Sequence, residues 1–108
     1  MNERPLILIT NDDGYKAPGI GFITELAREF GDVVVVAPVK GQSGMSHAVT
    51  LTEPIRFTLK SEARGITIYS CSGTPADCVK IALNKVLVRK PDLIISGINH
   101  GSNSSVSL

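Results

Sequence analysis

Residues 6–14 read LILITNDDG, four apolar residues followed by a short polar segment that ends in glycine. A continuous apolar run of this length, rich in β-branched side chains, is typical of a strand buried on both faces of a parallel sheet. Asn, Asp and Gly favour turns, so residues 11–14 should end the strand. The stretch therefore predicts a buried strand over 6–9, with the adjacent carboxylates Asp12 and Asp13 just beyond its carboxyl end.

A helix and a second strand follow this segment. Pro18 suits the first turn of a helix over 18–30, and Gly31 is placed to end it as a C-cap. Four apolar residues share one face of this helix: Ile20, Ile23, Ala27 and Phe30. The valine-rich run 33–37 repeats the pattern of a buried strand, and Pro38 ends it. The opening is thus predicted as a βαβ unit with a right-handed crossover.

The second half of the chain continues the alternation of strands and helices. Thr74 is an N-cap candidate for a second helix, Asp77 completes a capping box, and Arg89 and Lys90 suit the far end before Pro91 stops it. The remaining segments are a loop over 40–48, two strands near 49–58 and 66–70, and a buried strand over 92–96. The predicted class is α/β with a mainly parallel sheet and flanking helices. Residues 102–108 neither continue a helix nor close a domain, so we expect a truncated fold.

Composition excludes several classes of protein. The 108 residues carry 11 basic and 10 acidic side chains, a formal net charge of +1, which argues against binding to a nucleic-acid polymer or to a membrane surface. No apolar run reaches about 18 residues, and the start shows no signal peptide. We expect a cytoplasmic protein in which Cys71 and Cys78 are reduced and behave as small buried apolar residues.

Polar residues follow three of the predicted parallel strands. In open α/β sheets, ligands bind beyond the carboxyl ends of the strands. Asp12 and Asp13 follow the first strand, Ser43 lies in the loop after the second, and Asn99 follows the last. These side chains offer only oxygens, which suits one hard divalent ion such as Mg²⁺, Mn²⁺ or Ca²⁺ rather than zinc. The same Asn-Asp-Asp-Gly segment is also ordinary turn chemistry.

The start of the second helix is a weaker candidate for phosphate binding. Ser72-Gly73-Thr74 precedes it, and free backbone N–H groups at a helix N-terminus attract anions. Simple capping by Thr74 explains the same residues, and we favour that interpretation.

Four blocks together resemble the stationary-phase survival protein SurE family of metal-dependent 5′/3′-nucleotidases. They are residues 9–14 (ITNDDG), 36–38 leading to Ser43, 72–79 (SGTPADCV) and 96–103 (SGINHGSN). The resemblance covers essentially the whole chain, but members of the family are about twice as long. It implies that residues 1–108 form the N-terminal portion of a single Rossmann-like catalytic domain.

The resemblance also implies a function. It places a divalent ion on the positions matching Asp12, Asp13, Ser43 and Asn99, with Asp12 and Asp13 as the catalytic carboxylates. Our candidates for phosphate or substrate contact lie in the same blocks: Asn11, Gly44, Thr74 and Asn103. Family members hydrolyse nucleoside monophosphates, some also shorten polyphosphate, and they are typically dimers or tetramers. We expect a hydrolase of this kind, with a homodimeric or homotetrameric full-length protein.

Two alternatives belong to other classes of protein. A phospho-receiver domain has a similar length and an acidic pair after its first strand, but it needs an aspartate at the end of a middle strand. Residues 70–72 read Ser-Cys-Ser at that position. A non-catalytic nucleotide-binding module is the other alternative; it would bind nucleotide without metal-dependent release of phosphate.

Overall fold

The computed structural model describes residues 4–39, 55–96 and 105–107. Six strands form one sheet in the order β3-β4-β2-β1-β5-β6. The strands are β1 (Leu6–Ile9), β2 (Asp32–Pro38), β3 (Phe57–Ala63), β4 (Ile66–Cys71), β5 (Leu93–Ser96) and β6 (Ser105–Ser107). The helices are α1 (Pro18–Arg28), α2 (Pro75–Ile81) and the π-helical turn η1 (Ala82–Val86) that continues α2. The four central strands β4, β2, β1 and β5 are parallel, and the two edge strands are antiparallel to their neighbours.

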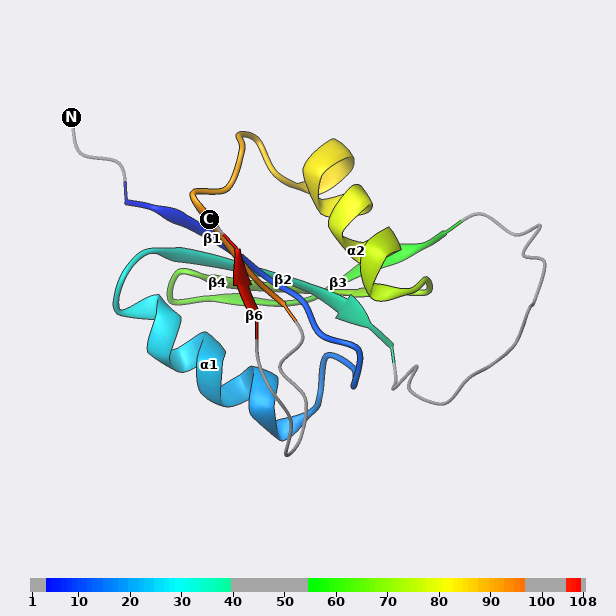
Figure 1. Ribbon diagram of the computed structural model, residues 1–108, viewed down its shortest axis with the longest axis horizontal. Coiled ribbons are helices and arrows are strands. Elements are labelled where there is room, and N and C mark those ends of the chain that lie inside the picture. The colour runs from blue at the N-terminus through cyan, green and yellow to red at the C-terminus, as the bar shows by residue number, and fades with distance from the viewer. Residues whose placement is uncertain (1–3, 40–54, 97–104, 108) are drawn as a thin grey trace.

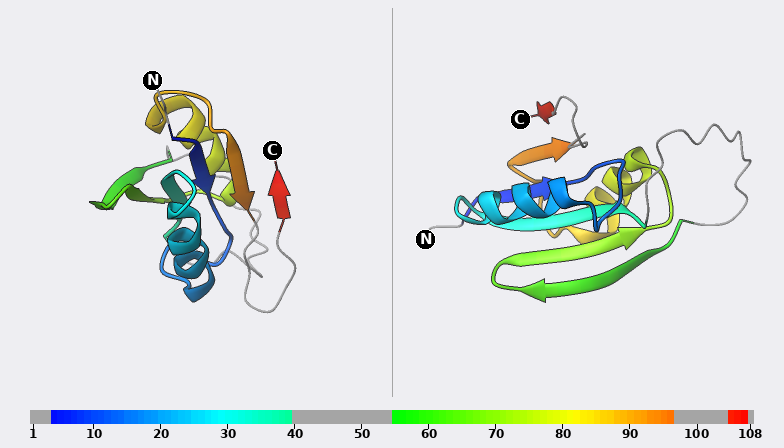
Figure 2. Two further views of the ribbon diagram at one scale, coloured as in Figure 1. Left: turned by 90° about the vertical axis from the view of Figure 1, so that its left-hand side faces the viewer. Right: turned by 90° about the horizontal axis from the view of Figure 1, so that it is seen from below.

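The two helices cover opposite faces of the sheet (Figures 1 and 2). Ile7 and Ile9 of β1 pack in the cluster beneath α1, whereas Leu8 packs in the cluster beneath α2. Successive side chains of a strand point to opposite faces, so each central strand contributes to both clusters. All four residues of β1 are buried, as the continuous apolar run predicts. The α/β class and the opening βαβ unit are confirmed.

The strand predicted near 49–58 has the wrong bounds where the structure describes it. Residues 49–54 lie outside the described part of the chain, residues 55–56 are not in a strand, and β3 begins at Phe57 and runs past residue 58 to Ala63. It forms a hairpin with β4, which confirms the predicted strand near 66–70. Arg64 and Gly65 make the two-residue turn with φ of 57° and 80°, values typical of a type I′ turn. Every residue of β3 is exposed, and only the short alternation over residues 57–60 marks the strand in the sequence.

Two expectations for the end of α1 are also wrong. The helix ends at Arg28, and Phe30 is 68% exposed rather than part of the core. Gly31 does not take the left-handed conformation of a glycine C-cap; positive φ occurs in the described chain only at Gly14, Arg64 and Gly65. A Cβ on Gly31 would instead lie 2.3 Å from the carbonyl oxygen of Pro5. Glycine is therefore required here because two backbone segments pass close together.

Replacement of Gly31 by Ala should destabilise the chain by about 1–3 kcal/mol, because the backbone at Pro5 has to move to admit the methyl group. Gly21→Ala is the matched control. Gly21 lies inside α1 with open space around its Cβ position, and the change should stabilise the helix by up to about 1 kcal/mol. Urea unfolding followed by circular dichroism measures both effects, and equal behaviour of the two variants would contradict the steric argument.

The second helix begins as predicted and ends earlier. Thr74 and Asp77 form the capping box: the Thr74 hydroxyl accepts from the Asp77 N–H, and the Asp77 carboxylate accepts from the Thr74 N–H. The prediction that the helix continues to Lys90 is wrong. The helix widens into the π-helical turn η1 and ends at Val86, and Leu87 has an extended backbone. The N–H of Leu87 closes that turn by donating to the carbonyl of Ala82 at 2.8 Å.

The strand predicted over 92–96 is confirmed as β5, although it is less covered than expected. Only Ile95 is buried, whereas Leu93 and Ile94 are half-buried. In the tail, Ser105–Ser107 form the short strand β6 beside β5, an element that the sequence analysis does not predict. Ser107 pairs with Ile94, and Ser105 pairs with Ser96.

Asp92 joins the amino ends of β1 and β5. Its carboxylate accepts the Leu6 N–H at 2.7 Å and pairs with Arg89 at 3.1 Å. The Leu6 N–H first, and the Arg89 guanidinium second, hold the pKa of the Asp92 carboxyl below its usual range. A carboxyl whose pKa is lowered by folding stabilises the fold above its unfolded pKa, and this contribution is lost as the pH falls.

Asp92→Asn should therefore lower the melting temperature at pH 7, and the deficit should shrink as the pH falls below about 4, where the wild-type carboxyl becomes protonated. Thermal unfolding of both proteins between pH 7 and pH 3 checks this. A deficit of the same size at both ends of the range would show that the charge of Asp92 has no part in the effect.

Candidate metal and phosphate site

The segment after β1 lies at the carboxyl edge of the sheet, between the ends of β2 and β5. The N–H of Thr10 donates to the carbonyl of Ile95 in β5 at 2.9 Å. On the other side, the N–H of Tyr15 donates to the carbonyl of Pro38 at the end of β2, also at 2.9 Å. These two bonds attach both ends of the segment to the neighbouring strands. The acidic pair is thus held where ligands bind in open α/β sheets.

Asn11 closes the acidic segment into a tight loop. Its side chain is fully buried, and its amide nitrogen donates to the Gly14 carbonyl at 2.9 Å. Its amide oxygen accepts the Gly14 N–H at 3.2 Å. Gly14 has a φ of 111°, a conformation that glycine adopts without strain. Because the loop uses both ends of the Asn11 amide, these bonds give Asn11 a structural role.

Asp12 carries an acceptor that the described residues leave unsatisfied. Its Oδ1 is buried and makes no hydrogen bond to any group of the described chain. Burial of a charged oxygen without a partner is costly, and such groups in native structures pair with donors or coordinate metals. Asp13 follows directly and is half-buried. Two neighbouring carboxylates repel each other unless a cation or a proton lies between them.

The other predicted metal and substrate residues cannot be placed. Ser43, Gly44, Asn99 and Asn103 lie outside the described residues. The strands that precede them in sequence, β2 and β5, flank β1 in the sheet and end at the edge where Asp12 and Asp13 lie. In the described part of the chain, no group of three or more His, Cys, Asp or Glu side chains is arranged to hold a metal.

The arrangement at Thr74 agrees with capping. The Thr74 N–H and hydroxyl both donate to the Asp77 carboxylate, each at 3.0 Å. A Cβ on Gly73 would lie 2.6 Å from the Asp77 side chain, so glycine is needed for this close packing. The carboxylate therefore occupies the place beside the Thr74 N–H that a phosphate would take.

The two cysteines are buried in the cluster beneath α2, and neither forms a disulfide. Burial, followed by the hydrogen bond and the charge of Cys71, raises the pKa of the Cys78 thiol. Such a thiol stays protonated near neutral pH and is a poor nucleophile. Cys71 and Cys78 thus pack as the small apolar residues that the sequence predicts.

A feature beside the acidic loop was not predicted from the sequence. The ammonium groups of Lys16 and Lys60 each lie 5.8 Å from the centre of the Tyr15 ring. Lys16 follows the loop directly, but Lys60 comes from β3 and is distant in the sequence. Only the hairpin topology brings it near Tyr15. The two lysines add positive charge close to the end of the loop, which favours the approach of anions.

Comparison with known proteins identifies relatives of the chain. The family model described as "Survival protein SurE" matches residues 7–108. The 5'-nucleotidase SurE of Christiangramia forsetii is 57% identical over 100% of this chain and 43% of its own length, and that of Flavobacterium johnsoniae is 56% identical over 99% and 42%. The crystal structure of the SurE protein from Aquifex aeolicus matches with a TM-score of 0.74 and 43% identity, covering 92% of this chain and 39% of that one. The chain thus spans about two fifths of the length of these relatives.

The described helices give no indication of a membrane span. None of those helices is both long enough and apolar enough to cross a bilayer.

Proposed function

Because the chain belongs to the SurE family, whose model matches residues 7–108, we propose that it supplies the metal-binding edge of a nucleotidase that hydrolyses nucleoside 5′-monophosphates. The observation that carries the proposal is the buried Oδ1 of Asp12, an acceptor at the carboxyl edge of the sheet for which residues 4–39, 55–96 and 105–107 supply no donor. A divalent ion would satisfy this oxygen, and the neighbouring carboxylate of Asp13 offers it a second oxygen ligand. Relatives named 5'-nucleotidase SurE support the choice of reaction.

In this proposal the side chains divide into ligands and positioning groups. Asp12 and Asp13 would hold the ion, and Ser43 and Asn99, which follow the flanking strands, would supply further oxygen ligands. Asn11 fixes the loop through its two bonds to Gly14. When bound, the ion would neutralise charge on the phosphate and activate a water for in-line attack. Asp12 or Asp13 would also serve as the base that takes a proton from the attacking water.

We propose that residues around the metal site bind the phosphate group of the substrate. Gly44 offers a backbone N–H without a covering side chain, and Asn103 offers an amide to the phosphate. Thr74 remains a candidate at the rim, although Asp77 occupies its N–H and hydroxyl in this structure. Lys16 and Lys60 attract the anionic substrate. We extend the proposal to 3′-monophosphates and short polyphosphate as substrates, and to a homodimeric or homotetrameric complete protein.

Phosphate release tests the proposal. The protein to assay is a chimera in which residues 1–108 replace the matching 43% of the C. forsetii relative, alongside the 108-residue chain itself. Each is incubated with 5′- and 3′-nucleoside monophosphates in Mn²⁺, in Mg²⁺ and in EDTA. We expect metal-dependent release from the 5′-monophosphates by the chimera. Nucleotide binding without release in any metal would overturn the proposal in favour of a binding module.

The phospho-receiver alternative lacks its essential residue. The described parallel strands other than β1 end in Pro38, Cys71 and Ser96, none of which is a carboxylate. The sheet also differs from an all-parallel receiver sheet, because β3 and β4 form an antiparallel hairpin. Acetyl phosphate labelling followed by intact mass should therefore show no added phosphoryl group.

A further inference from the structure

A bulge in β3 directs Lys60 toward the acidic loop. Leu59 and Ser61 pair with consecutive residues of β4, so Lys60 is an extra residue that no residue of β4 opposes. Ser61 lies opposite Ile68, which packs against the cluster beneath α1. Lys60 reaches the same face of the sheet, because its ammonium group lies 5.8 Å from the centre of the Tyr15 ring. Bulges are frequent beside functional sites, where they change the direction of a side chain.

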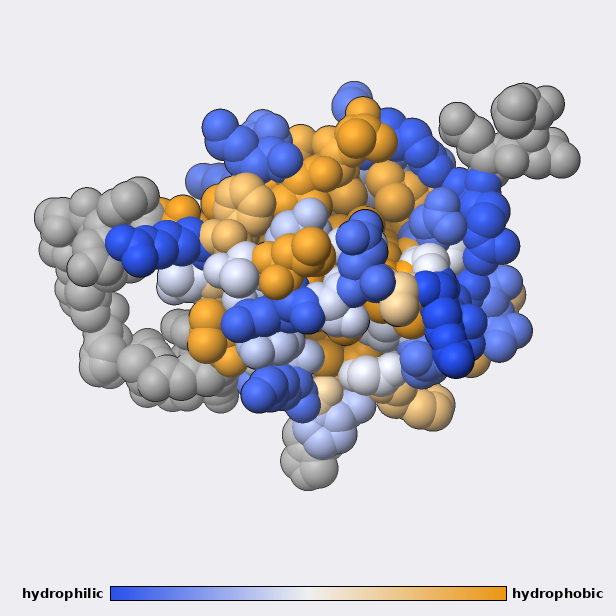
Figure 3. Space-filling model, turned by 180° about the vertical axis from the view of Figure 1, so that it is seen from behind, coloured by the Kyte–Doolittle hydropathy of each residue, from blue (hydrophilic) through white to orange (hydrophobic). Residues whose placement is uncertain are grey.

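A second ammonium group lies at the same ring. Lys16, the residue after Tyr15, is also 5.8 Å from the ring centre. Neither lysine forms an ion pair with a carboxylate of the described residues. Figure 3 views the molecule from the side of the β3–β4 hairpin, where hydrophilic side chains stand out from apolar surface, and every residue of β3 is exposed. Like charges held near one ring repel each other, so an anion that contacts both is favoured there.

We propose that Lys16 and Lys60 bind a second phosphoryl group of the substrate, one that is not hydrolysed. This inference rests on the proposed function, because it takes the acidic loop as the place of the reacting phosphate. The Tyr15 N–H is bonded to the end of β2, so the ring and the lysines beside it are held next to that loop. A phosphate monoester carries nearly two negative charges at neutral pH, which matches two ammonium groups. Nucleoside bisphosphates and short polyphosphates carry such a second group.

A cavity of about 230 Å³ beside Tyr15 gives this group room. It lies between α1 and the hairpin, and its lining includes the hydroxyl-bearing Ser61 and the cationic Arg64. Among the described residues that line it, only Glu25 has a carboxylate, and Arg28 already pairs with that carboxylate at 3.2 Å. An anion that enters beside the ring therefore meets hydrogen-bond donors rather than an unpaired negative charge.

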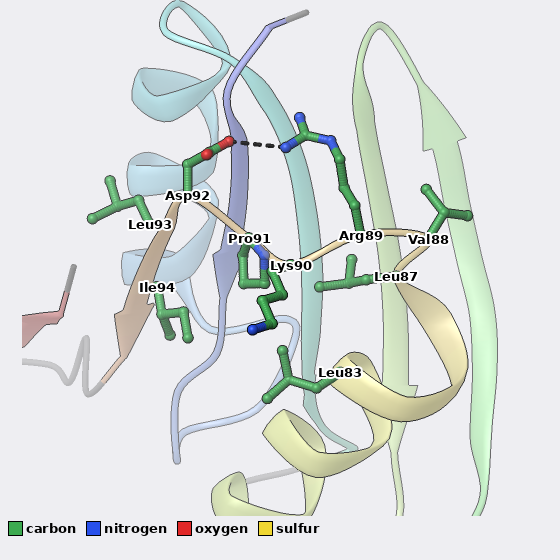
Figure 4. Close-up of a pocket in the computed structure, with 9 residues that line it drawn as sticks. All are labelled: Leu83, Leu87, Val88, Arg89, Lys90, Pro91, Asp92, Leu93 and Ile94. Atoms are coloured by element: carbon green, nitrogen blue, oxygen red, sulfur yellow. Dashed lines mark hydrogen bonds and ion pairs between the residues drawn. The ribbon is translucent and has the colours of Figure 1, made fainter.

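The groove at the opposite end of the strands supplies a control lysine. Figure 4 shows Lys90 in this groove of about 500 Å³, near the ion pair of Arg89 and Asp92. Asp92 is bonded to the Leu6 N–H at the amino end of β1, whereas the acidic loop follows the carboxyl end of that strand. Lys90 is exposed and makes no ion pair within the described ranges. It matches Lys60 in charge and exposure but is remote from the proposed subsite.

Kinetics of the chimera with two nucleotides test the proposal. Adenosine 3′,5′-bisphosphate should have a KM at least about tenfold below that of adenosine 5′-monophosphate, because it gains charge-assisted hydrogen bonds. Lys60→Gln and Lys16→Gln should each remove most of this difference by raising the KM for the bisphosphate more than that for the monophosphate. Lys60→Arg should keep the difference, and Lys90→Gln should alter neither KM. Melting temperatures should stay at the wild-type value, since these lysines are exposed.

Tripolyphosphate, added as a competitor, tests a phosphate chain as the other source of the second group. Inhibition that Lys60→Gln weakens would support the subsite and assign it to the chain if the two nucleotides have equal KM values. Equal KM values together with inhibition that Lys60→Gln leaves unchanged would overturn the proposal. Equal effects of Lys60→Gln on both nucleotides would also overturn it, because the lysine would then only attract anions in general.

The proposed nucleotidase activity and the subsite fail in different ways. If the chimera releases no phosphate, the nucleotides stay intact and their affinities can be titrated directly in Mn²⁺. A tighter affinity for the bisphosphate that is lost in Lys60→Gln would then support the subsite without the reaction. Affinities that are the same in the wild type and in Lys60→Gln would overturn the subsite as well.

Discussion

Asp12→Asn should lower metal-dependent phosphate release by the chimera at least about a hundredfold, which corresponds to roughly 3 kcal/mol of transition-state stabilisation. The amide keeps the shape of the side chain but removes the charge of the buried Oδ1, which accepts no hydrogen bond from the described part of the chain. Asp13→Asn should have a comparable effect, because both carboxylates are proposed ligands of the same ion. Release is measured at saturating Mn²⁺ with the preferred nucleoside 5′-monophosphate.

Two further measurements separate loss of the metal from loss of the fold. Mn²⁺ at about 100 times its dissociation constant should stabilise the wild type by roughly 2.7 kcal/mol and should leave Asp12→Asn almost unchanged. Glu29→Gln is the control substitution, since Glu29 is exposed and follows α1 at the other edge of the sheet. Near-wild-type turnover by a folded Asp12→Asn protein would disprove the assignment of Asp12 as a ligand.

Leu8→Ala should destabilise the 108-residue chain by about 2–5 kcal/mol, a large part of the stability of a small domain. Leu8 is 0% exposed in the middle of β1 and packs in the cluster that joins the sheet to α2. Truncation removes buried methyl groups and leaves a cavity between parallel strands that cannot collapse freely. Urea unfolding gives the loss directly, with an unchanged dependence on urea if the unfolded state is unaffected.

Leu8→Ile and Leu26→Ala distinguish this effect from a general intolerance of substitution. Leu8→Ile conserves volume and should cost less than about 1.5 kcal/mol, so it stays measurable if Leu8→Ala does not fold. Leu26 is a leucine that is 49% exposed on α1, and its truncation should cost much less than that of Leu8. A loss for Leu8→Ala no greater than for Leu26→Ala would refute the central place of β1 in the core.

The central strands could be predicted because both of their faces are buried. The run 33–36 could be recognised as a strand without an alternating pattern, since both faces of β2 are covered and apolar side chains suit either face. β3 could not be placed, because it is exposed throughout at the edge of the sheet. The sequence analysis explained Gly31 as a helix C-cap, which is wrong. The glycine is needed because the chain passes close to Pro5, a residue that is distant in sequence and near only in the fold.

In the candidate site, too, features encoded by neighbouring residues could be predicted, whereas contacts between residues distant in sequence could not. Asp12 and Asp13 could be placed because a strand end is visible in the sequence, and the topology then fixes the edge. The absence of a donor to Oδ1 of Asp12 among the described residues depends on the packing of segments that are distant in sequence, so no local sequence pattern predicts it. Lys60 approaches Tyr15 only through the hairpin of β3 and β4, which the sequence does not reveal.

The two hydrogen bonds between Asn11 and Gly14 have a consequence for the affinity of the proposed metal site. Together with the anchors at Thr10 and Tyr15, they fix the backbone of the acidic loop. An ion that binds the proposed site would therefore meet carboxylates on an ordered backbone and would not have to order a flexible segment. Free energy that ordering of the chain would otherwise consume would be retained as affinity. Asn11 would thus strengthen metal binding in the proposed site without being one of the proposed ligands.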